Sequence, residues 1–393
     1  MYERYLNFES ILERKSLFFI GPRLTGKSTL LKNRYPGSVY INLLKQSELQ
    51  KYLSMPNALE QEIDYLVKDK AGIIVIIIDE VQKAVSLLNE VHHLIEKYKH
   101  IRFILSGSSA RKLKRSQANL LGGRASWVNL HPLCFAELDQ QSKIDWYKIP
   151  IQGGLPSIFD STNPWDDLDD YIGMYLKEEI QAEGLSRSIE NFSRFLQFVA
   201  TVNTEQVNYT SLASDAQLAP STVREYFQIL EDTLIGYSLP AFLQTQKRKA
   251  MTTAKFYLFD CGIANALLNR RNLVSNTAEY GKSLEQALFL EIRAYLDYNR
   301  IKMKFEFWRS TSKFEVDFLL YNDTKQIIAI EVKSTRNPTS KDFKGLMAFE
   351  EEFAIYRKII VCNVDRPRKT QENIEILPIL DFLKLLWSGE LLA

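Results

Sequence analysis

A short segment near the amino end combines glycine, lysine and hydroxyl side chains in a spacing suited to binding phosphate. Residues 21–29 read GPRLTGKST, and Gly21, Gly26, Lys27 and Ser28 fit the Walker A pattern G-x-x-x-x-G-K-[ST] without a mismatch. Glycine lets backbone N–H groups turn toward a phosphate, while Lys27 would reach the β- and γ-phosphates and Ser28 would ligate Mg²⁺. The residues expected to contact ATP are Gly21, Pro22, Arg23, Leu24, Thr25, Gly26, Lys27, Ser28 and Thr29.

Two adjacent acids supply the second half of this chemistry. Residues 73–80 read IIVIIIDE, an apolar run that ends in Asp79 and Glu80. Asp79 fits the Walker B acid that holds Mg²⁺ through water, and Glu80 fits the residue that orients or polarises the attacking water. The alternative is that both acids only cap the following helix. Behind a complete Walker A pattern, we predict binding of ATP and Mg²⁺ and hydrolysis of ATP.

Further polar groups could complete a nucleotide site. Residues 101–109, IRFILSGSS, end in small hydroxyl side chains, so Ser106 or Ser108 is expected to sense the γ-phosphate or position water. The alternative is that these serines only shape a turn. Arg111, Arg115 and Arg124 follow, and any one of them could be an arginine finger; we choose Arg124, because Gly122-Gly123 allows close backbone approach. It could act in cis or from a neighbouring subunit, and the latter would require a homo-oligomer.

The last third of the chain holds a second group of residues with chemical potential. Residues 314–320 and 326–335 read as two strands of a hairpin, which would bring Asp317, Glu331 and Lys333 onto one face. Two carboxylates beside a lysine can hold a divalent metal and activate a water, as metal-dependent phosphodiester cleavage needs. Glu285, on an expected helix, would add a third carboxylate, with Glu291 as the other choice. The alternative is an ion-paired cluster without catalytic function.

The elements that must position these residues predict an α/β protein. Apolar runs at 17–20, 38–43, 73–78, 101–109 and 126–130, with a helical stretch at 47–70, predict a parallel, doubly wound sheet. Residues 209–230 read as helix, turn and helix, with Leu212, Ala213 and Ala216 facing the core and Ser221 as an N-cap. The exposed candidates for DNA contact are Thr222, Arg224, Glu225 and Gln228, and only one of them is cationic. A packing or partner-binding role is therefore the alternative.

Composition limits the remaining classes. With 393 residues and 46% hydrophobic content, the chain can form two or three cored domains. A net charge of +2 gives no global nucleic-acid footprint, so DNA or RNA binding would depend on local patches. The three cysteines form no C-x-x-C pair, which disfavours a zinc site or a disulfide framework. No signal segment or membrane span is visible, so we expect a cytoplasmic protein without a membrane partner.

The order of several segments resembles a known family. GPRLTGKST, IIIDEVQK, ILSGSSARKL, LLGGRA, HPLCFAEL and GGLPSIF are similar to segments of prokaryotic AAA+ ATPases that carry a C-terminal domain of unknown function. The resemblance implies an AAA+ P-loop domain at 1–145, a helical and winged-helix region at 146–245, and a nuclease-like domain at 246–393. Asp317 and Glu331-Val332-Lys333 also resemble the PD-(D/E)-x-K nuclease superfamily, with Val316 in place of proline.

Two functional classes follow from these patterns. The first is an ATP-driven enzyme that processes DNA or RNA, in which the ATPase controls a C-terminal nuclease. The second is a regulatory or signalling ATPase whose C-terminal domain only binds DNA or a partner. A metal-dependent cleavage assay separates them.

Overall fold

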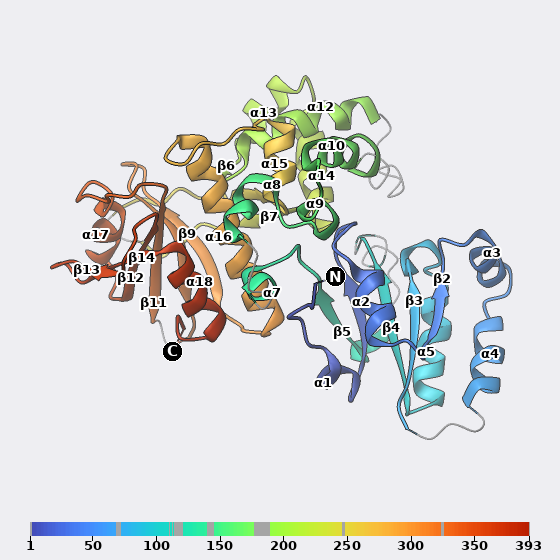
Figure 1. The fold of residues 1–393 in the computed structure, drawn as a ribbon. Helices are drawn as coiled ribbons and strands as arrows, with labels where there is room; N and C mark the ends of the chain where they lie inside the picture. The colour runs from blue at the N-terminus through green and yellow to red at the C-terminus, as the bar shows by residue number, and fades with distance from the viewer. Residues whose placement is uncertain are drawn as a thin grey trace. The chain divides into compact units, whose positions relative to one another are not determined.

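The computed structural model describes residues 2–67, 72–109, 111, 113, 121–139, 145–176, 189–245, 248–323 and 326–392. The chain divides into two compact units, whose elements are drawn in Figure 1. The amino-terminal unit comprises residues 1–131 and 232–234, and the carboxyl-terminal unit comprises 132–231 and 235–393.

The amino-terminal unit is built on a five-stranded parallel sheet in the order β2-β3-β4-β1-β5. Its strands are β1 (Ser16–Ile20), β2 (Val39–Asn42), β3 (Ile74–Asp79), β4 (Ile101–Gly107) and β5 (Ala125–Asn129). Its helices are α1 (Glu9–Leu12), α2 (Lys27–Arg34), α3 (Gln46–Ser54), α4 (Ala58–Val67) and α5 (Leu87–Lys97), with 3-10 turns η1 (Val81–Lys83) and η2 (Leu121–Gly123). The predicted parallel sheet is confirmed.

The strand order determines where polar side chains meet. The central strand β1 is buried along its whole length between β4 and β5, as its apolar sequence requires. Because all five strands run the same way, the residues that follow β1, β3 and β4 gather at one edge of the sheet. The phosphate-binding loop, Asp79 and the serines after β4 all lie at that edge.

Two predicted helices differ in extent from those observed. The helix expected over 47–70 is two helices, α3 and α4, with Pro56 between them, and 68–70 lie outside the described residues. Proline removes a backbone donor and disfavours helical geometry in the residue before it. The helix expected directly after Glu80 begins only at Leu87, because Val81–Lys83 form a 3-10 turn.

The carboxyl-terminal unit contains two sheets and many helices. A six-stranded sheet has the order β13-β14-β12-β11-β10-β9 and a three-stranded antiparallel sheet the order β6-β8-β7. The strands are β6 (Glu205–Gln206), β7 (Gly236–Leu239), β8 (Lys255–Leu258), β9 (Lys304–Arg309), β10 (Glu315–Tyr321), β11 (Ile327–Lys333), β12 (Ile355–Cys362), β13 (Arg368–Lys369) and β14 (Ile374–Pro378). The helices up to the helix-turn-helix are α7 (Phe135–Asp139), η3 (Trp146–Lys148), α8 (Ile149–Gln152), α9 (Pro156–Phe159), α10 (Pro164–Asp170), η4 (Tyr171–Leu176), α12 (Ile189–Val199) and η5 (Ala200–Val202). The remaining helices are α13 (Tyr209–Asp215), α14 (Pro220–Asp232), α15 (Cys261–Leu267), α16 (Ala278–Tyr298), α17 (Lys344–Glu350) and α18 (Ile379–Ser388).

Both local predictions for this unit can be compared with the structure. Strands β10 and β11 form the expected antiparallel hairpin, with Phe318 opposite Ile330. The helix-turn-helix segment is α13 and α14, and Leu212, Ala213 and Ala216 are buried as predicted. Ser221 is not an N-cap, because α14 already begins at Pro220, a residue well suited to a first helical position.

The middle segment packs against a later helix of this unit instead of standing apart, since α8 contacts α15. Asn265 on α15 donates from Nδ2 to the carbonyls of Pro150 (2.9 Å) and Ile151 (2.8 Å). The α7 segment, expected in the first domain, also belongs to this unit. The two compact units therefore do not coincide with the three predicted domains, which have boundaries near 145 and 245. The three-domain division remains a prediction.

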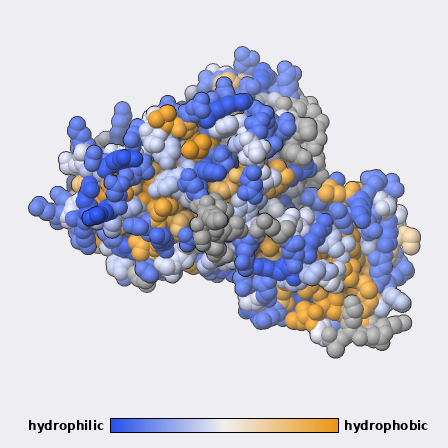
Figure 2. Space-filling view, in the orientation of Figure 1, coloured by the Kyte–Doolittle hydropathy of each residue, from blue (hydrophilic) through white to orange (hydrophobic). Residues whose placement is uncertain are grey.

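The surfaces of the units differ in the view of Figure 2. Hydrophobic residues gather on the visible face of the amino-terminal unit, whereas hydrophilic residues cover most of the visible carboxyl-terminal unit. Across the described residues, no helix combines the length and hydrophobicity needed to cross a bilayer.

Candidate functional site

The phosphate-binding loop is held between β1 and α2 by close backbone contacts. The Gly21 N–H donates to the Gly107 carbonyl at 3.3 Å, and a Cβ at position 21 would lie 2.5 Å from the Leu130 carbonyl oxygen. Gly26 has φ +90°, a conformation that favours glycine. Both Walker A glycines are therefore required by the local backbone.

Lys27 is the buried cation of this loop. Its Nζ donates to the carbonyls of Gly21 (2.6 Å) and Pro22 (2.9 Å), and Thr25 Oγ1 donates to the same Pro22 carbonyl at 2.8 Å. A phosphate is a stronger partner for an ammonium than a carbonyl group, so an anion in the loop can compete for Nζ.

The other residues of the loop differ in exposure. Arg23 is half-buried, whereas Leu24 and Thr29 are exposed. Leu24 also has a positive φ of 61°, so the backbone of the loop turns sharply there.

Arg4 supports the loop and was not identified from the sequence. This buried side chain donates from Nη1 to the Thr25 carbonyl and from Nη2 to the His131 carbonyl, each at 2.6 Å. The guanidinium thus ties the loop to the segment after β5. No motif marks Arg4, because its two partners are distant in sequence.

Asp79 and Ser28 form the pair that would hold Mg²⁺. Ser28 Oγ donates to Asp79 Oδ2 at 2.8 Å, and the hydroxyl of Tyr40 on β2 donates to the same oxygen. Asp79 Oδ1 is buried and has no hydrogen-bond partner. Burial together with the Asp79 carboxylate raises the pKa of Tyr40, which keeps the phenol protonated as a donor. An unpartnered carboxylate oxygen beside a serine hydroxyl fits the preference of Mg²⁺ for oxygen ligands.

Glu80 and Ser106 lie beside this pair. Glu80 takes a left-handed backbone conformation, with φ 61° and ψ 41°. Ser106 is opposite Asp79 in the parallel pairing of β3 and β4, and its Oγ is buried without a partner. The structure therefore brings Lys27, Ser28, Asp79, Glu80 and Ser106 to one edge of the sheet.

Arg124 is not part of this edge. It precedes β5, and its carbonyl accepts from the N–H of Ser16, the first residue of β1. The phosphate-binding loop follows the other end of β1, roughly 15 Å along the strand. The Arg124 side chain pairs with Glu96 on α5. The topology therefore places Arg124 at the opposite end of β1 from the phosphate-binding loop, and its role as an arginine finger, in cis or from a neighbouring subunit, stays a prediction.

The carboxyl-terminal cluster brings together the four side chains predicted for it. Asp317 Oδ2 accepts from the Val332 N–H across the hairpin at 2.9 Å, and Lys333 Nζ donates to Glu331 Oε1 at 2.5 Å. Glu285 on α16 joins the cluster through a lysine that it shares with Asp317.

That shared lysine is Lys255, which was not identified from the sequence. Its side chain is 2% exposed, and Nζ lies 2.6 Å from Glu315 Oε1, 2.9 Å from Glu285 Oε1 and 3.4 Å from Asp317 Oδ1. Tyr257, two residues along β8, donates to Glu285 Oε1 at 2.7 Å. A single buried ammonium therefore pairs with three carboxylates supplied by two other elements. The available signal was a lysine at the start of the apolar run KFYLF.

The protonation of this cluster depends on burial and on Lys255. Burial alone would lower the pKa of Lys255, but the surrounding carboxylates, led by Glu285, raise it well above its ordinary value. Burial raises the pKa of Glu285 to about 7 against the opposing effect of Lys255. It likewise raises the pKa of Glu331 to about 8, with the Asp317 charge adding to the shift.

These contacts do not fit a divalent metal. Both Asp317 oxygens have partners, Glu331 Oε1 is paired with Lys333, and the Lys255 ammonium lies among the carboxylates where a cation would bind. Glu331 Oε2 is the buried oxygen of this set without a partner. Within the described ranges, no group of three or more His, Cys, Asp or Glu side chains could hold a metal ion.

Glu291, the other acid considered on α16, has a different environment. Its carboxylate accepts from the Phe135 N–H (2.9 Å), Trp146 Nε1 (2.7 Å) and Trp387 Nε1 (2.8 Å). Burial raises its pKa to about 7, with these donors acting in the opposite direction. Glu291 therefore joins α7, η3 and α18 to α16, and Glu285 is the acid that belongs to the cluster.

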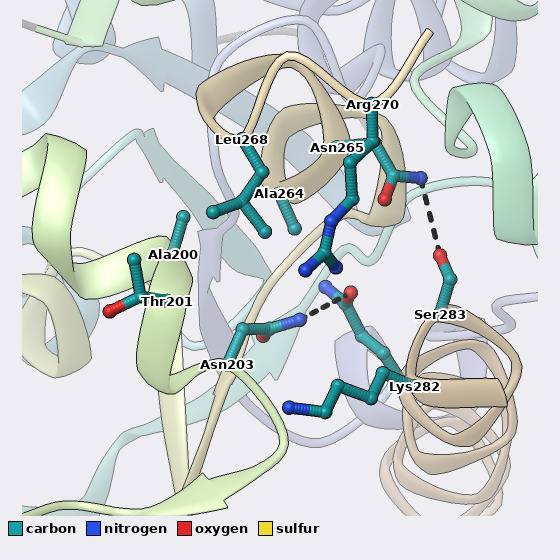
Figure 3. A pocket seen from close by; sticks show the side chains of 10 residues that line it. Ala200, Thr201, Asn203, Ala264, Asn265, Leu268, Arg270, Lys282 and Ser283 are labelled. Carbon is teal, nitrogen blue, oxygen red and sulfur yellow. Dashed lines mark hydrogen bonds between the residues drawn. The ribbon is translucent and has the colours of Figure 1, made fainter. Parts of the chain in front are cut away.

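A small cavity elsewhere in this unit is shown in Figure 3, with Arg270 pointing into it. The polar side chains of its floor bond to one another: Asn203 Nδ2 donates to Gln286 Oε1 (2.8 Å), and Asn265 Nδ2 to Ser283 Oγ (3.2 Å). The cavity has room for about one water molecule, so it is not a ligand site.

Comparison with known families agrees with the nucleotide site. Residues 13–139 match the family described as "AAA domain". Residues 144–273 and 280–382 match two families described as domains of unknown function. The AAA match and the geometry at the sheet edge support a P-loop ATPase.

Similar proteins add little about function. An uncharacterised protein of Mycobacterium tuberculosis is 24% identical over 270 residues, which are 67% of this chain and 59% of that protein. An uncharacterised protein of Methanocaldococcus jannaschii is 21% identical over 319 residues, 72% of this chain and 68% of that protein. The ADP form of the ORC2 protein of Aeropyrum pernix is 14% identical over 66% of this chain and 89% of that chain, with a TM-score of 0.32. A TM-score of this size carries no inference about this chain.

Proposed function

We propose that this protein binds ATP with Mg²⁺ and hydrolyses it at the carboxyl edge of the amino-terminal sheet. The observation that carries this proposal is the meeting of Lys27, Ser28, Asp79 and Glu80, with the buried Asp79 Oδ1 lacking a partner. Lys27 would turn from its loop carbonyls to the phosphates, and Ser28 and Asp79 would hold Mg²⁺. The ion neutralises phosphate charge when bound. Glu80 would orient the attacking water and accept its proton.

Replacing Glu80 by glutamine tests this proposal. The amide cannot accept the proton, whereas Asp79 and Lys27 are unchanged, so the variant should retain ATP affinity and lose turnover by roughly 100-fold or more. Phosphate release and equilibrium ATP binding are the two measurements. Half-buried Glu90 on α5 offers a control, because Glu90→Gln should change neither. Wild-type turnover in Glu80→Gln would remove Glu80 from the mechanism.

For the carboxyl-terminal unit, we propose the non-catalytic alternative, a module that binds DNA or a partner. Lys255 carries this proposal, because its ammonium already compensates Glu285, Glu315 and Asp317. The competing hypothesis is metal-dependent phosphodiester cleavage by Asp317, Glu331, Lys333 and Glu285. The cleavage hypothesis is supported by the fact that these four side chains lie in one cluster.

A cleavage assay separates the two hypotheses. We expect no cleavage of single-stranded DNA, double-stranded DNA or RNA with Mg²⁺ or Mn²⁺, with or without ATP. Should wild type cleave any of these substrates and Asp317→Ala abolish the cleavage while ATP hydrolysis continues, the nuclease hypothesis is correct. EDTA alone is a poor control, because it also removes Mg²⁺ from ATP.

The nature of the partner and of any assembly is less constrained. On α14, Arg224, Glu225 and Gln228 are exposed, and one cation beside one acid is a weak basis for gripping phosphates. A partner-binding role is thus favoured over DNA binding. The hydrophobic residues on the amino-terminal unit in Figure 2 support the hypothesis of a homo-oligomer.

A further inference from the structure

Gln82 connects the catalytic acid Glu80 to the end of the neighbouring strand. Its Nε2 donates to Glu80 Oε2 at 2.6 Å and to Ser108 Oγ at 3.1 Å. The Gln82 residue is 8% exposed. A primary amide has two N–H bonds, and both are therefore directed at named partners.

Several local features that are unfavourable by themselves accompany this contact. Gln82 Oε1 is buried and has no hydrogen-bond partner. A Cβ at Gly107 would lie 2.3 Å from that oxygen, so the amide fits only because residue 107 is glycine. Glu80 has a left-handed backbone conformation, which is strained for a residue with a side chain. Unfavourable features persist where the surrounding structure requires them, and they are concentrated at functional sites.

The position of Gln82 between two strand ends explains how it can hold the Glu80 carboxylate. Strands β3 and β4 are paired with Asp79 opposite Ser106, so Glu80 and Ser108 follow the ends of adjacent strands. Gln82 spans these two ends. Its N–H group fixes one oxygen of the Glu80 carboxylate, while Ser108 fixes the amide itself.

We propose that Gln82 is a positioning residue that orients the Glu80 carboxylate toward the attacking water. This inference rests on the ATPase function proposed above. Gln82 takes no part in proton transfer, because its amide donates hydrogen bonds to Glu80 and does not exchange a proton with the substrate. Gln82 lies after β3 and outside the 21–29 loop, so its loss should act on turnover and not on ATP affinity.

Gln82→Leu tests the proposal, because leucine has a similar size but no donor. We expect kcat for ATP hydrolysis to fall roughly tenfold or more, since misplacing a catalytic group by about 1 Å can cost up to about 100-fold. KM and the equilibrium affinity for ATP should stay within about twofold of wild type. Gln286→Leu is the matched control, because Gln286 is also a buried amide with hydrogen bonds, but it lies in the other unit.

A second background separates positioning from structural damage. Glu80→Asp retains a carboxylate but shortens the side chain, so the acid can no longer reach Gln82 as it does in wild type. Adding Gln82→Leu to Glu80→Asp should therefore change kcat by less than about twofold. A structural defect would lower kcat in both backgrounds. If Gln82→Leu does not fold, Ser108→Ala provides the same test. It should lower kcat at unchanged KM in the wild-type background and should have no further effect on kcat in the Glu80→Asp background.

Two results overturn the inference: an unchanged or increased kcat in a folded Gln82→Leu protein, or an equal loss in the wild-type and Glu80→Asp backgrounds. Failure of the proposed function is distinguishable from both. It would appear as absent Mg²⁺-dependent hydrolysis in wild type, or as wild-type turnover in Glu80→Gln.

Discussion

Lys255 shows how much one residue can decide about a cluster of charges. Replacing it by methionine retains most of the side-chain volume but leaves Glu285 and Asp317 without their buried cation. Removing one partner of a buried ion pair costs about 3–5 kcal/mol. We therefore expect Lys255→Met to lower the free energy of unfolding by about 3 kcal/mol, measured by urea denaturation. The excess negative charge should also create Mn²⁺ binding that wild type lacks, measured in the Asp79→Asn background without nucleotide.

Lys358 offers a matched control on the same sheet as Asp317. It is also a buried lysine, and it contacts both oxygens of Glu350 at 2.7 Å, but the Glu350 side chain is 36% exposed. Water can solvate that carboxylate when the lysine is removed, so Lys358→Met should cost less and bind no Mn²⁺. If Lys255→Met neither loses stability nor binds Mn²⁺, then Lys255 is not the compensating cation.

The residues found from the sequence and those missed differ in one physical respect. Walker A and Walker B are readable because phosphate and Mg²⁺ chemistry requires adjacent residues at a fixed spacing, as in Gly26-Lys27-Ser28 and Asp79-Glu80. Tyr40 and Lys255 reach their partners only through the pairing of strands and the packing of α16. Contacts of this kind have no fixed spacing along the chain, so no motif marks them.

At the scale of an element, one acid of α16, Glu291, connects this helix to three other helical elements, α7, η3 and α18. Glu291 accepts hydrogen bonds from the Phe135 N–H and from the indoles of Trp146 and Trp387. Because burial raises its pKa to about 7, the folded protein holds this proton more tightly than the unfolded chain does. Its contribution to stability is therefore fully present below the unfolded value of 4.5 and is lost as the pH rises through about 7.

Glu291→Gln removes this titration and tests the predicted direction in which stability changes with pH. The wild-type free energy of unfolding should fall by up to about 3 kcal/mol relative to the variant between pH 5 and 8. Urea denaturation of both proteins at several pH values measures the difference in slope. Glu279, an exposed acid in the first turn of the same helix, supplies the control variant Glu279→Gln. Parallel pH profiles for wild type and Glu291→Gln would contradict the assignment.

Element boundaries were predicted less well than element types. The parallel sheet and the β10–β11 hairpin follow directly from apolar runs and alternation, and both are confirmed. The 47–70 helix is divided at Pro56, a break that proline itself explains, whereas no proline or glycine marks the 3-10 turn at Val81–Lys83. Periodicity alone does not contain that information.

At the scale of the whole molecule, the two units should respond differently to nucleotide. The proposed ATP and Mg²⁺ site lies in the amino-terminal unit, whereas the carboxyl-terminal cluster already contains its cation in Lys255. A ligand that binds only the folded state adds about 2.7 kcal/mol of stability at 100 times its dissociation constant. ATP with Mg²⁺ should therefore slow amide hydrogen exchange in β1, β3 and α2, and Lys27→Ala should abolish this effect by removing the cation aimed at the phosphates.

Chelation then tests both sites in one protein. EDTA should reverse most of the protection that ATP and Mg²⁺ give to β1, β3 and α2, because Ser28 and Asp79 would lose the ion that they hold beside the phosphates. Exchange in β10 and β11 should not change, because Lys255 is covalently part of the chain and cannot be chelated. Region-resolved mass spectrometry gives both results from one sample. Faster exchange in β10 and β11 after EDTA treatment would reveal a divalent metal among Asp317, Glu331 and Glu285, and would favour the nuclease hypothesis over a cluster closed by lysine.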